Sequence, residues 1–363
     1  MTKTTHPKRI VLTGGGTAGH VTPNIALLPA LKDLKYEIFY IGSHNGIEKK
    51  LISDYHIPYF GISTGKLRRY FDIKNLTDPL RVIKGYAEAK KHLKEIKPDV
   101  VFSKGGFVSV PIVRAAASLK IPCIIHESDM TPGLANRLCI STAKIICCNF
   151  PETVKMLKSK KAVLTGTPIR SELKFGNPVA ALDLCDFTAN KPVIMVIGGS
   201  LGASCINEVL RTALPKLLHD FQIIHICGKD KIDDTLLNIK GYKQFEYVKS
   251  ELKDLLAIAE LVVSRAGANS ICEMLALKKP NLLIPLSASS SRGDQIQNAR
   301  SFESQGFSVV INEKDLTESL LIDKIHELYF SRTNYIEAMD KSNQLNSIQT
   351  ITTLIEQTVS RYR

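Results

Sequence analysis

The chain has 363 residues, of which 44% are hydrophobic and 23% are charged, and its net charge is +13. This composition is typical of a globular protein and excludes a low-complexity chain, and the length suits two domains of roughly 150 residues each. No apolar run approaches the ~18 residues of a membrane span, and the one near the N-terminus is too short for a signal peptide. We therefore expect a soluble or peripheral protein.

Short β-branched runs alternate with segments of helical spacing in the first half of the chain, the pattern of parallel βαβ units. The first run ends in a glycine-rich turn that opens a helix. The expected strands are RIVLTG at 9–14, YEIFYIG at 36–42, DVVFSKG at 99–105, PCIIHES at 122–128 and AKIICC at 143–148.

The second half repeats this order, again beginning with a strand, a glycine turn and a helix. Its expected strands are PVIMVIGG at 192–199, QIIHICG at 222–228, FEYV at 245–248, LVVSRAG at 261–267, NLLIPL at 281–286 and FSVVI at 307–311. We predict an α/β protein of two doubly wound domains, 1–168 and 169–344. The stretch 345–363 has helical apolar spacing and could pack back on either domain, including the first.

The first glycine turn places Gly14, Gly16 and Gly19 in the GxGxxG spacing of a dinucleotide site. A nicotinamide enzyme usually carries an acidic residue at the end of the second strand, but this strand ends in Gly42 and Ser43. We therefore disfavour a dehydrogenase. What remains is a helix N-terminus that can face an anion.

His20 ends this turn, where the carboxyl end of a strand meets the expected site. An imidazole with an ordinary pKa of about 6.5 can act as a general base near neutral pH. A histidine that caps or packs against the helix would occupy the same position, so the position alone leaves both interpretations open.

The second glycine turn, Gly198–Ala203, lacks the lysine of a P-loop, which disfavours nucleotide hydrolysis. Ser200 at the start of a helix suits a diphosphate, although a tight βα turn would look the same. Further along, SRAGANSICEM places Glu273 where a carboxylate could accept both ribose hydroxyls, or could be a solvated surface group.

Seven segments together resemble, in order and spacing, the bacterial MurG family of N-acetylglucosaminyltransferases. They are GGTAGH (15–20), SKGGFVSVP (103–111), HESDMTPGLANRL (126–138), GTPIR (166–170), GGSLGA (198–203), SRAGANSICE (264–273) and RGDQIQNA (292–299). The resemblance spans about residues 10–311. It implies a GT-B fold, with two Rossmann-like domains facing across a cleft. It also implies inverting transfer of N-acetylglucosamine from UDP-N-acetylglucosamine to the 4-hydroxyl of a muramyl sugar on a polyprenyl diphosphate.

The resemblance also assigns site residues. His20 matches the residue favoured as base, Arg170 and Ser200 match contacts to the donor diphosphate, and Glu273 matches a ribose contact. The remaining donor contacts implied are Thr17, Ala18, Gly19, Asp129, Val248, Ala268, Asn269, Ser270, Ile271, Cys272 and Gln295. Asp129 is a departure, since many relatives have HEQN where this chain has HESD.

The turn Ser103–Val108 is a candidate for the acceptor diphosphate, with Gly105 and Gly106 at its centre. No DxD triplet occurs in the sequence, so we predict neither a metal nor a cofactor.

The charge is unevenly distributed: residues 1–168 contain 26 Lys and Arg against 12 Asp and Glu. In the segment 66–84, basic residues are mixed with apolar ones, which suits an anionic membrane surface. Helical spacing assigns some apolar residues of this region to the core instead, namely Val82, Ile83, Tyr86, Leu93 and Ile96.

The eight cysteines lie mostly in apolar runs, as expected for free thiols in a reducing compartment. We therefore expect a peripheral protein at the cytoplasmic face of the cell membrane.

Three other interpretations remain. A different GT-B enzyme, such as a glycolipid glycosyltransferase or a UDP-sugar 2-epimerase, is nearest. A nucleic-acid binder would explain the basic half but leaves two glycine turns unexplained, so we predict no nucleic acid partner. A dehydrogenase would bind nicotinamide.

Overall fold

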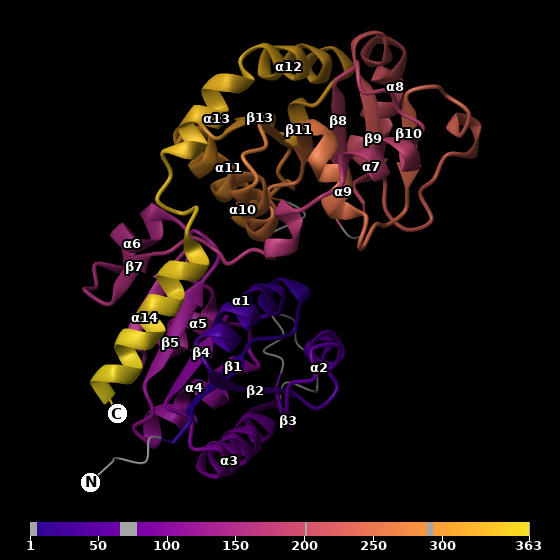
Figure 1. The fold of residues 1–363 in the computed structure, drawn as a ribbon. Helices are drawn as coiled ribbons and strands as arrows, with labels where there is room; N and C mark the ends of the chain where they lie inside the picture. Colours follow the sequence, from indigo (N-terminus) through magenta and orange to yellow (C-terminus); the bar gives the residue numbers. More distant parts are fainter. Residues whose placement is uncertain (1–5, 66–77, 200–201, 289–292, 363) are drawn as a thin grey trace. The chain divides into compact units, whose positions relative to one another are not determined.

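The computed structural model describes residues 6–65, 78–199, 202–288 and 293–362. The chain divides into two compact units, Met1–Arg170 with Asn346–Arg363, and Ser171–Leu345. Each unit is built on its own parallel β-sheet with helices on both faces (Figure 1). The predicted domain boundaries were 168/169 and 344/345. The observed divisions lie two residues and one residue further along the chain.

In the first unit, the described residues form a seven-stranded sheet of order β3-β2-β1-β4-β5-β6-β7. The strands are β1 (Lys8–Thr13), β2 (Tyr36–Ser43), β3 (Tyr59–Ile62), β4 (Val100–Ser103), β5 (Cys123–Glu127), β6 (Ile145–Cys148) and β7 (Ala162–Leu164). The edge strands β3 and β7 were not predicted, because they are only four and three residues long and carry little periodicity. The strand order reverses between β1 and β4, the topological switch point at which such sheets bind ligands.

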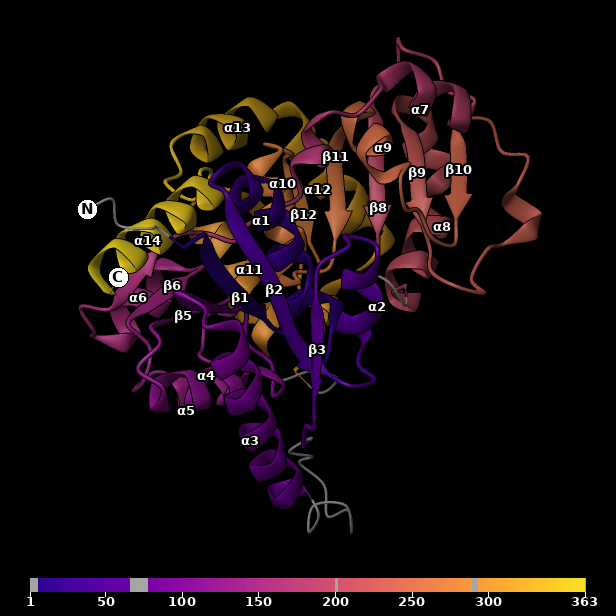
Figure 2. The same cartoon turned by 60° about the horizontal axis from the view of Figure 1, so that its bottom comes forward.

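The sheet of the first unit has two cores. Ile10 and Leu12 of β1 pack with α1 and α14 on one face, while Val11 packs with α3 and α4 on the other (Figure 2). This alternation is the period of two expected of a strand buried on both sides. The helices of this unit are η1 (Ala18–His20), α1 (Thr22–Asp33), α2 (Ile47–Ser53), α3 (Asp78–Ile96), α4 (Ser109–Ser118), α5 (Leu134–Cys139), α6 (Pro151–Leu157) and α14 (Ser347–Tyr362).

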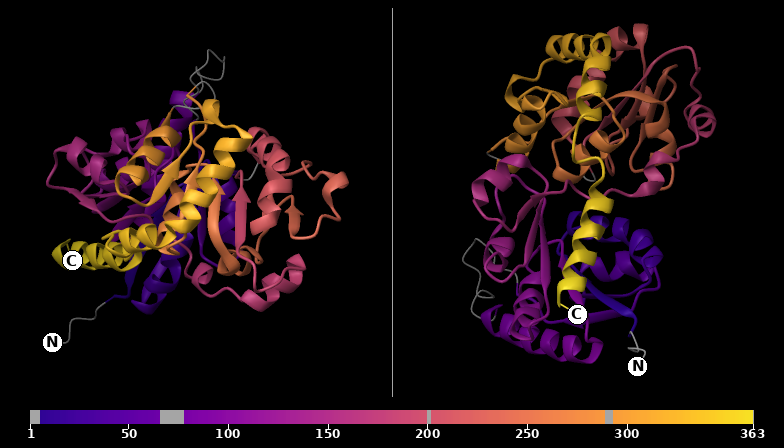
Figure 3. Two further views of the ribbon diagram at one scale, coloured as in Figure 1. Left: turned by 90° about the horizontal axis from the view of Figure 1, so that it is seen from above. Right: turned by 60° about the vertical axis from the view of Figure 1, so that its left-hand side comes forward.

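Helix α14 packs against α1 and β4 of the first unit (Figure 3). Ile351, Ile355 and Val359 lie in the same core as β1. Glu356 accepts hydrogen bonds from Lys8 and from the Tyr36 hydroxyl, both at 2.5 Å. Helix α14 is therefore held on the first unit by apolar packing and by the hydrogen bonds of Glu356.

The second unit holds a six-stranded sheet among its described residues, of order β10-β9-β8-β11-β12-β13. Its strands are β8 (Val193–Ile197), β9 (Gln222–Ile226), β10 (Tyr242–Phe245), β11 (Ala259–Ser264), β12 (Asn281–Leu283) and β13 (Ser308–Val310). The strand expected at 245–248 lies three residues earlier, because Gly241 turns the chain and Tyr242 then pairs with Ile223.

Helices α8 and α12 cover one face of this second sheet, and α7, α9 and α10 cover the other. The helices of the unit are η3 (Ser171–Lys174), α7 (Pro178–Cys185), α8 (Ser204–Asp220), η4 (Asp234–Leu236), α9 (Leu252–Ile258), α10 (Ala268–Ala276), α11 (Asp294–Ser304), η5 (Glu313–Asp315), α12 (Glu318–Phe330) and α13 (Arg332–Asp340). Across both units, no helix in the described ranges has the length and apolar character of a membrane span.

We expect Ile355→Ala to lower the free energy of unfolding by about 2 to 5 kcal/mol, because it leaves a cavity between α14 and the sheet. Ile355 is fully buried. Chemical denaturation of the purified protein measures the effect. The exposed Thr353→Ala on the same helix is the control, with an expected change under about 0.5 kcal/mol. Equal changes in the two variants would contradict the docking of α14.

Candidate functional site

The first glycine turn follows β1 and opens α1. Gly16 has a φ of +86°, a conformation that favours glycine. A side chain at Gly14 would overlap the carbonyl oxygen of His20, and its Cβ would lie 3.1 Å from Lys104 Cβ. The GxG spacing read from the sequence therefore reflects a turn that folds back on itself.

Buried polar groups hold this turn from beneath. The Tyr40 hydroxyl donates to the Gly14 carbonyl at 2.6 Å, and Asn24 Nδ2 donates to the Thr13 carbonyl at 3.1 Å. The Gly16 N–H donates to Glu48 Oε2 at 3.2 Å. None of these three side chains was singled out from the sequence, because nothing in their local patterns separates them from ordinary core or surface residues.

His20 is half-buried at the end of the turn, with its Nδ1 3.0 Å from Thr17 Oγ1. Its pKa is lowered from 6.5 to about 4, chiefly by burial and also by the nearby Lys104 ammonium, against the opposing effects of the Gly15 backbone and Glu48. The imidazole is therefore neutral at physiological pH and can accept a proton. Thr17 and Ala18 are exposed and Gly19 is partly exposed beside it.

The predicted acceptor turn, Ser103–Val108, follows β4 and contacts the glycine turn after β1. The Lys104 N–H donates to the Thr13 carbonyl at 2.8 Å, and a side chain at Gly106 would overlap the carbonyl oxygen of Gly15. Gly105 and Gly106 have φ values of +93° and +81°. The structure thus brings the predicted acceptor turn and the predicted base to the same edge of one sheet.

Lys104 lies beneath both turns and is only 1% exposed. Its ammonium bonds to His126 Nδ1 at 2.9 Å and to the Ser128 hydroxyl. His126 Nε2 meets the Gly166 carbonyl at 2.8 Å. With an ammonium at Nδ1, the imidazole proton belongs on Nε2, and the pKa of His126 is well below its usual value because the ring is buried.

Asp129 follows β5 in a loop organised by Glu127. The buried Glu127 carboxylate accepts from the backbone N–H groups of Asp129 and Gly133, both at 3.0 Å, and from Asn136 Nδ2 at 2.8 Å. Burial raises the pKa of Glu127. Asp129 itself is half-buried, and Arg170, also half-buried, is the last residue of the first unit before the chain enters the second.

In the second unit, the glycine turn after β8 leads into α8. Ser200 lies outside the described residues. A side chain at Gly202, whose φ is +68°, would overlap the Cys227 carbonyl oxygen. Asn207 Nδ2 donates to that same carbonyl at 2.9 Å, and His225 Nε2 meets Asn207 Oδ1 at 3.0 Å. This turn too is held from beneath by buried polar side chains.

The segment Ala268–Glu273 opens α10 directly after β11, the strand beside β8 at the reversal of the second sheet. Ala268, Asn269 and Glu273 are partly exposed and Ser270 is exposed. Ile271, Cys272 and Val248 are at most 8% exposed, and their side chains belong to the interior. These three residues could meet a ligand chiefly through their backbone.

Side-chain hydrogen bonds and an ion pair hold the chain around α10. Gln295 Oε1 accepts from the Leu286 N–H at 3.0 Å, and Asn298 Nδ2 donates to the Ala266 carbonyl at 3.2 Å. Arg265 pairs with Glu313 and donates to the Ile284 carbonyl at 3.1 Å. The Arg265–Glu313 pair was missed from the sequence, because its members are 48 residues apart.

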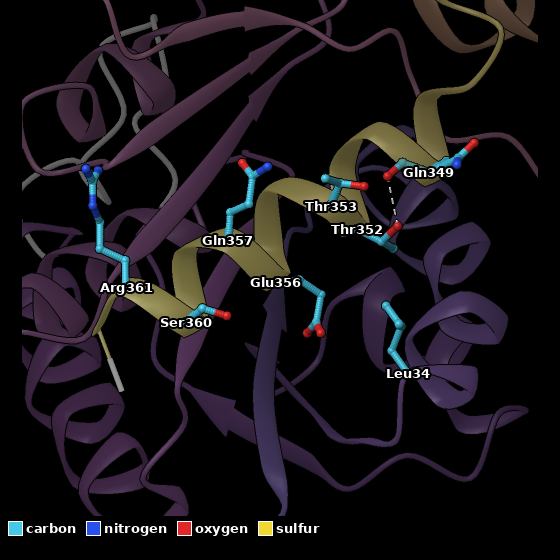
Figure 4. Close-up of a pocket in the computed structure, with 8 residues that line it drawn as sticks. All are labelled: Leu34, Gln349, Thr352, Thr353, Glu356, Gln357, Ser360 and Arg361. Carbon is cyan, nitrogen blue, oxygen red and sulfur yellow. Dashed lines mark hydrogen bonds between the residues drawn. The ribbon is translucent and has the colours of Figure 1, made fainter.

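Other features lie apart from these turns. A groove of about 710 Å³ runs beside α14 and contains none of the predicted site residues (Figure 4). Its lining is Leu34, Gln349, Thr352, Thr353, Glu356, Gln357, Ser360 and Arg361. Within the described part of the chain, no cluster of three or more His, Cys, Asp or Glu has the arrangement of a metal site.

We expect the His20 ring to titrate near pH 4 in an NMR titration, with the His20→Gln variant identifying its signal. Because folding lowers this pKa, the folded state holds fewer protons than the unfolded chain between pH 4 and 6.5. The stability that His20 contributes is therefore complete above pH 6.5 and is lost as the pH falls to 4. A midpoint near 6.5 would show that the ring is solvated.

Comparison with known proteins gives a consistent result. Residues 10–147 match the glycosyltransferase family 28 N-terminal domain, and residues 193–355 match the glycosyltransferase family 28 C-terminal domain. The chain is 62% identical over 349 residues to a protein of Lachnospira eligens, covering 96% of this chain and 99% of that protein. That relative is named UDP-N-acetylglucosamine--N-acetylmuramyl-(pentapeptide) pyrophosphoryl-undecaprenol N-acetylglucosamine transferase.

A protein of Lachnoclostridium phytofermentans with the same name is 61% identical over 350 residues, covering 96% of this chain and 99% of that protein. Among solved structures, MurG of Acinetobacter baumannii is similar with a TM-score of 0.77 and 26% identity, covering 97% of this chain and all of that one. The expected fold class and family are confirmed. The chain belongs to the MurG family of family 28 glycosyltransferases, which have the GT-B fold.

Proposed function

We propose that this enzyme transfers N-acetylglucosamine from UDP-N-acetylglucosamine to the 4-hydroxyl of the muramyl sugar in a polyprenyl-diphosphate-linked muramyl-peptide, a step of peptidoglycan synthesis. The names of its relatives supply the substrates. The observation that carries the proposal at the level of residues is the neutral His20 imidazole at the switch point of the first sheet, on the turn whose Gly15 backbone lies against Gly106.

His20 is the general base in this proposal. As the acceptor 4-hydroxyl oxygen attacks the anomeric carbon, its proton passes to the imidazole, and the bond from that carbon to the UDP oxygen breaks with inversion. A half-buried, uncharged imidazole keeps its lone pair available over the whole physiological pH range. The Gly105–Gly106 turn, in which Gly106 is partly exposed, is assigned to the acceptor diphosphate, since the buried Lys104 beneath it adds positive potential.

The UDP part of the donor is assigned to the second unit together with Arg170, the last residue of the first unit. The start of α8, with Ser200, and Arg170 would stabilise the departing diphosphate, an electrostatic effect of about 3 kcal/mol per well-placed donor. Glu273 on the partly exposed side of α10 would accept the ribose hydroxyls, and the backbone of Ala268–Cys272 with Val248 would line the uracil. Thr17, Ala18, Gly19, Asp129 and Gln295 are proposed contacts to the transferred sugar.

The reaction itself is tested with radiolabelled UDP-N-acetylglucosamine and a short-chain lipid-linked acceptor. Label entering the lipid fraction in an acceptor-dependent manner is the expected result. Label that stays in nucleotide sugar while UDP still binds would favour the epimerase interpretation.

We expect His20→Ala to lower turnover by about 100-fold or more, because the acceptor proton then has no base. UDP affinity, measured by calorimetry, should change less than twofold, since His20 is not among the residues assigned to the UDP part of the donor. The exposed His219→Ala in α8 is the control and should behave as the wild type. Normal turnover in the His20 variant would remove His20 from the mechanism.

We further propose that the enzyme acts as a peripheral protein at the cytoplasmic face of the membrane, docking through the start of α3. Most of the predicted basic and apolar segment, 66–77, lies outside the described residues. At its described end, Leu80 is 69% exposed and Ile83 is 65% exposed, next to exposed Arg81 and Lys84. Spacing assigned Ile83 to the core, but the core face of α3 turns out to be formed by Ala89, Leu93 and Ile96.

We expect the double variant Leu80→Ser/Ile83→Ser to bind vesicles of anionic phospholipid at least about tenfold more weakly, because two apolar side chains no longer enter the lipid. Sedimentation with vesicles measures this. A matched control is Phe175→Ser/Val179→Ser in the second unit, where the side chains are 75% and 65% exposed. Equal losses in both double variants, or none in either, would count against docking through α3.

A further inference from the structure

Glu48 on α2 is a buried carboxylate to which neither the sequence nor the proposed reaction assigns a role. It is fully buried. Oε2 accepts from the Gly16 N–H at 3.2 Å, and Oε1 accepts from the Ser43 N–H at 2.9 Å and from the Ser43 hydroxyl. Its hydrogen bonds thus join the end of β2 to the turn that carries His20.

Three glycines make room for this carboxylate. A Cβ at Gly15 would lie 2.6 Å from Glu48 Cδ, and one at Gly42 would lie 2.9 Å from Glu48 Cγ. At Gly46, a Cβ would overlap Oε1. The turn can therefore close on β2 only with glycine at these positions, and the group that fills the space is charged.

A buried ionised carboxylate is costly, and replacing buried charges by apolar groups of similar volume is often neutral or stabilising. Stability alone therefore does not account for a carboxylate at this position. The turn it supports ends in His20, and Lys104 lies against Gly14 on the same turn. Two fully buried groups of opposite charge thus flank the residues that lead to the proposed base.

The proposed reaction creates a positive charge on His20 when the imidazole takes the acceptor proton. The charged groups that act on this ring are Lys104, which disfavours the charged form, and Glu48, which favours it. The remaining influences are burial and the Gly15 backbone. A carboxylate beneath the turn therefore opposes both the ammonium and the loss of solvent as the proton arrives.

We propose that Glu48 is a positioning residue of the transfer reaction, which fixes the His20 turn through the Gly16 N–H and offsets the positive charge formed on His20. Glu48 exchanges no proton and touches no substrate. This inference rests on the proposed role of His20 as base.

The variant Glu48→Gln tests both parts of the role. Its side chain has nearly the same size, but it carries no charge, and its amide nitrogen cannot accept from an N–H. We expect turnover to fall at least about tenfold while UDP affinity stays within twofold. Hydrogen exchange in residues 14–20 should become faster, whereas β1 should exchange as in the wild type.

Glu88→Gln is the matched control. Glu88 also accepts a backbone N–H bond, from Ser63 at 2.6 Å, but lies on α3 away from the His20 turn. It should keep wild-type turnover. Turnover of Glu48→Gln within twofold of the wild type, or a loss no larger than that of Glu88→Gln, would overturn the proposal.

A double variant separates charge from packing. Lys104→Met removes the opposing ammonium, so adding it to Glu48→Gln should recover part of the lost turnover at saturating acceptor, a condition that separates this effect from the role of Lys104 in acceptor binding. It should also move the acidic limb of the pH profile to higher pH. A double variant whose losses simply multiply would show that Glu48 acts through packing alone and overturn its electrostatic role.

If His20→Ala retains turnover, the base assignment fails. If His20→Ala is inactive and Glu48→Gln is not impaired, only the present inference fails.

Discussion

The hydrogen bond from the Lys104 N–H to the Thr13 carbonyl, 2.8 Å long, extends the pairing of β1 and β4 beyond the last paired residues. It sits where the strand order of the first sheet reverses, so the chain leaves the two strands toward opposite faces. Both connections must begin as glycine turns, because a side chain at Gly106 would overlap the backbone of Gly15. The proximity of the proposed base to the proposed acceptor turn follows from this one pairing.

Charged side chains have different roles on the surface and in the interior of the first unit. Its surface carries the excess of basic residues, which solvent and salt screen. Beneath the glycine turns, by contrast, Lys104 and Glu48 are both buried and act in opposite directions on His20. Together, these two groups allow the imidazole to stay neutral before the reaction and to carry a positive charge once it has taken the proton.

The sequence was sufficient for features that depend on local pattern. Most strand positions and the glycine turns followed from periodicity and spacing, although the short edge strands β3 and β7 did not, and the family came from ordered motifs. Features that depend on tertiary contacts could not be read in this way. Glu48 is one charged residue in a helix with an otherwise ordinary pattern, and only the fold shows it enclosed by Gly15, Gly42 and Gly46. Likewise, spacing could not show that Ile271 and Cys272 face the interior while Ser270 is exposed.

The second unit holds its glycine turn with neutral groups instead. Tyr242, His225 and Asn207 form a buried chain of hydrogen bonds that ends at the Cys227 carbonyl beneath Gly202. Burial lowers the pKa of His225 to about 3, so this chain carries no charge at neutral pH. A carboxylate in the same place would repel the diphosphate proposed to bind above it, whereas beneath His20 a carboxylate stabilises the charge that forms. Each turn follows the first strand of its sheet, and the chemistry assigned to each explains why only the first is supported by a buried carboxylate.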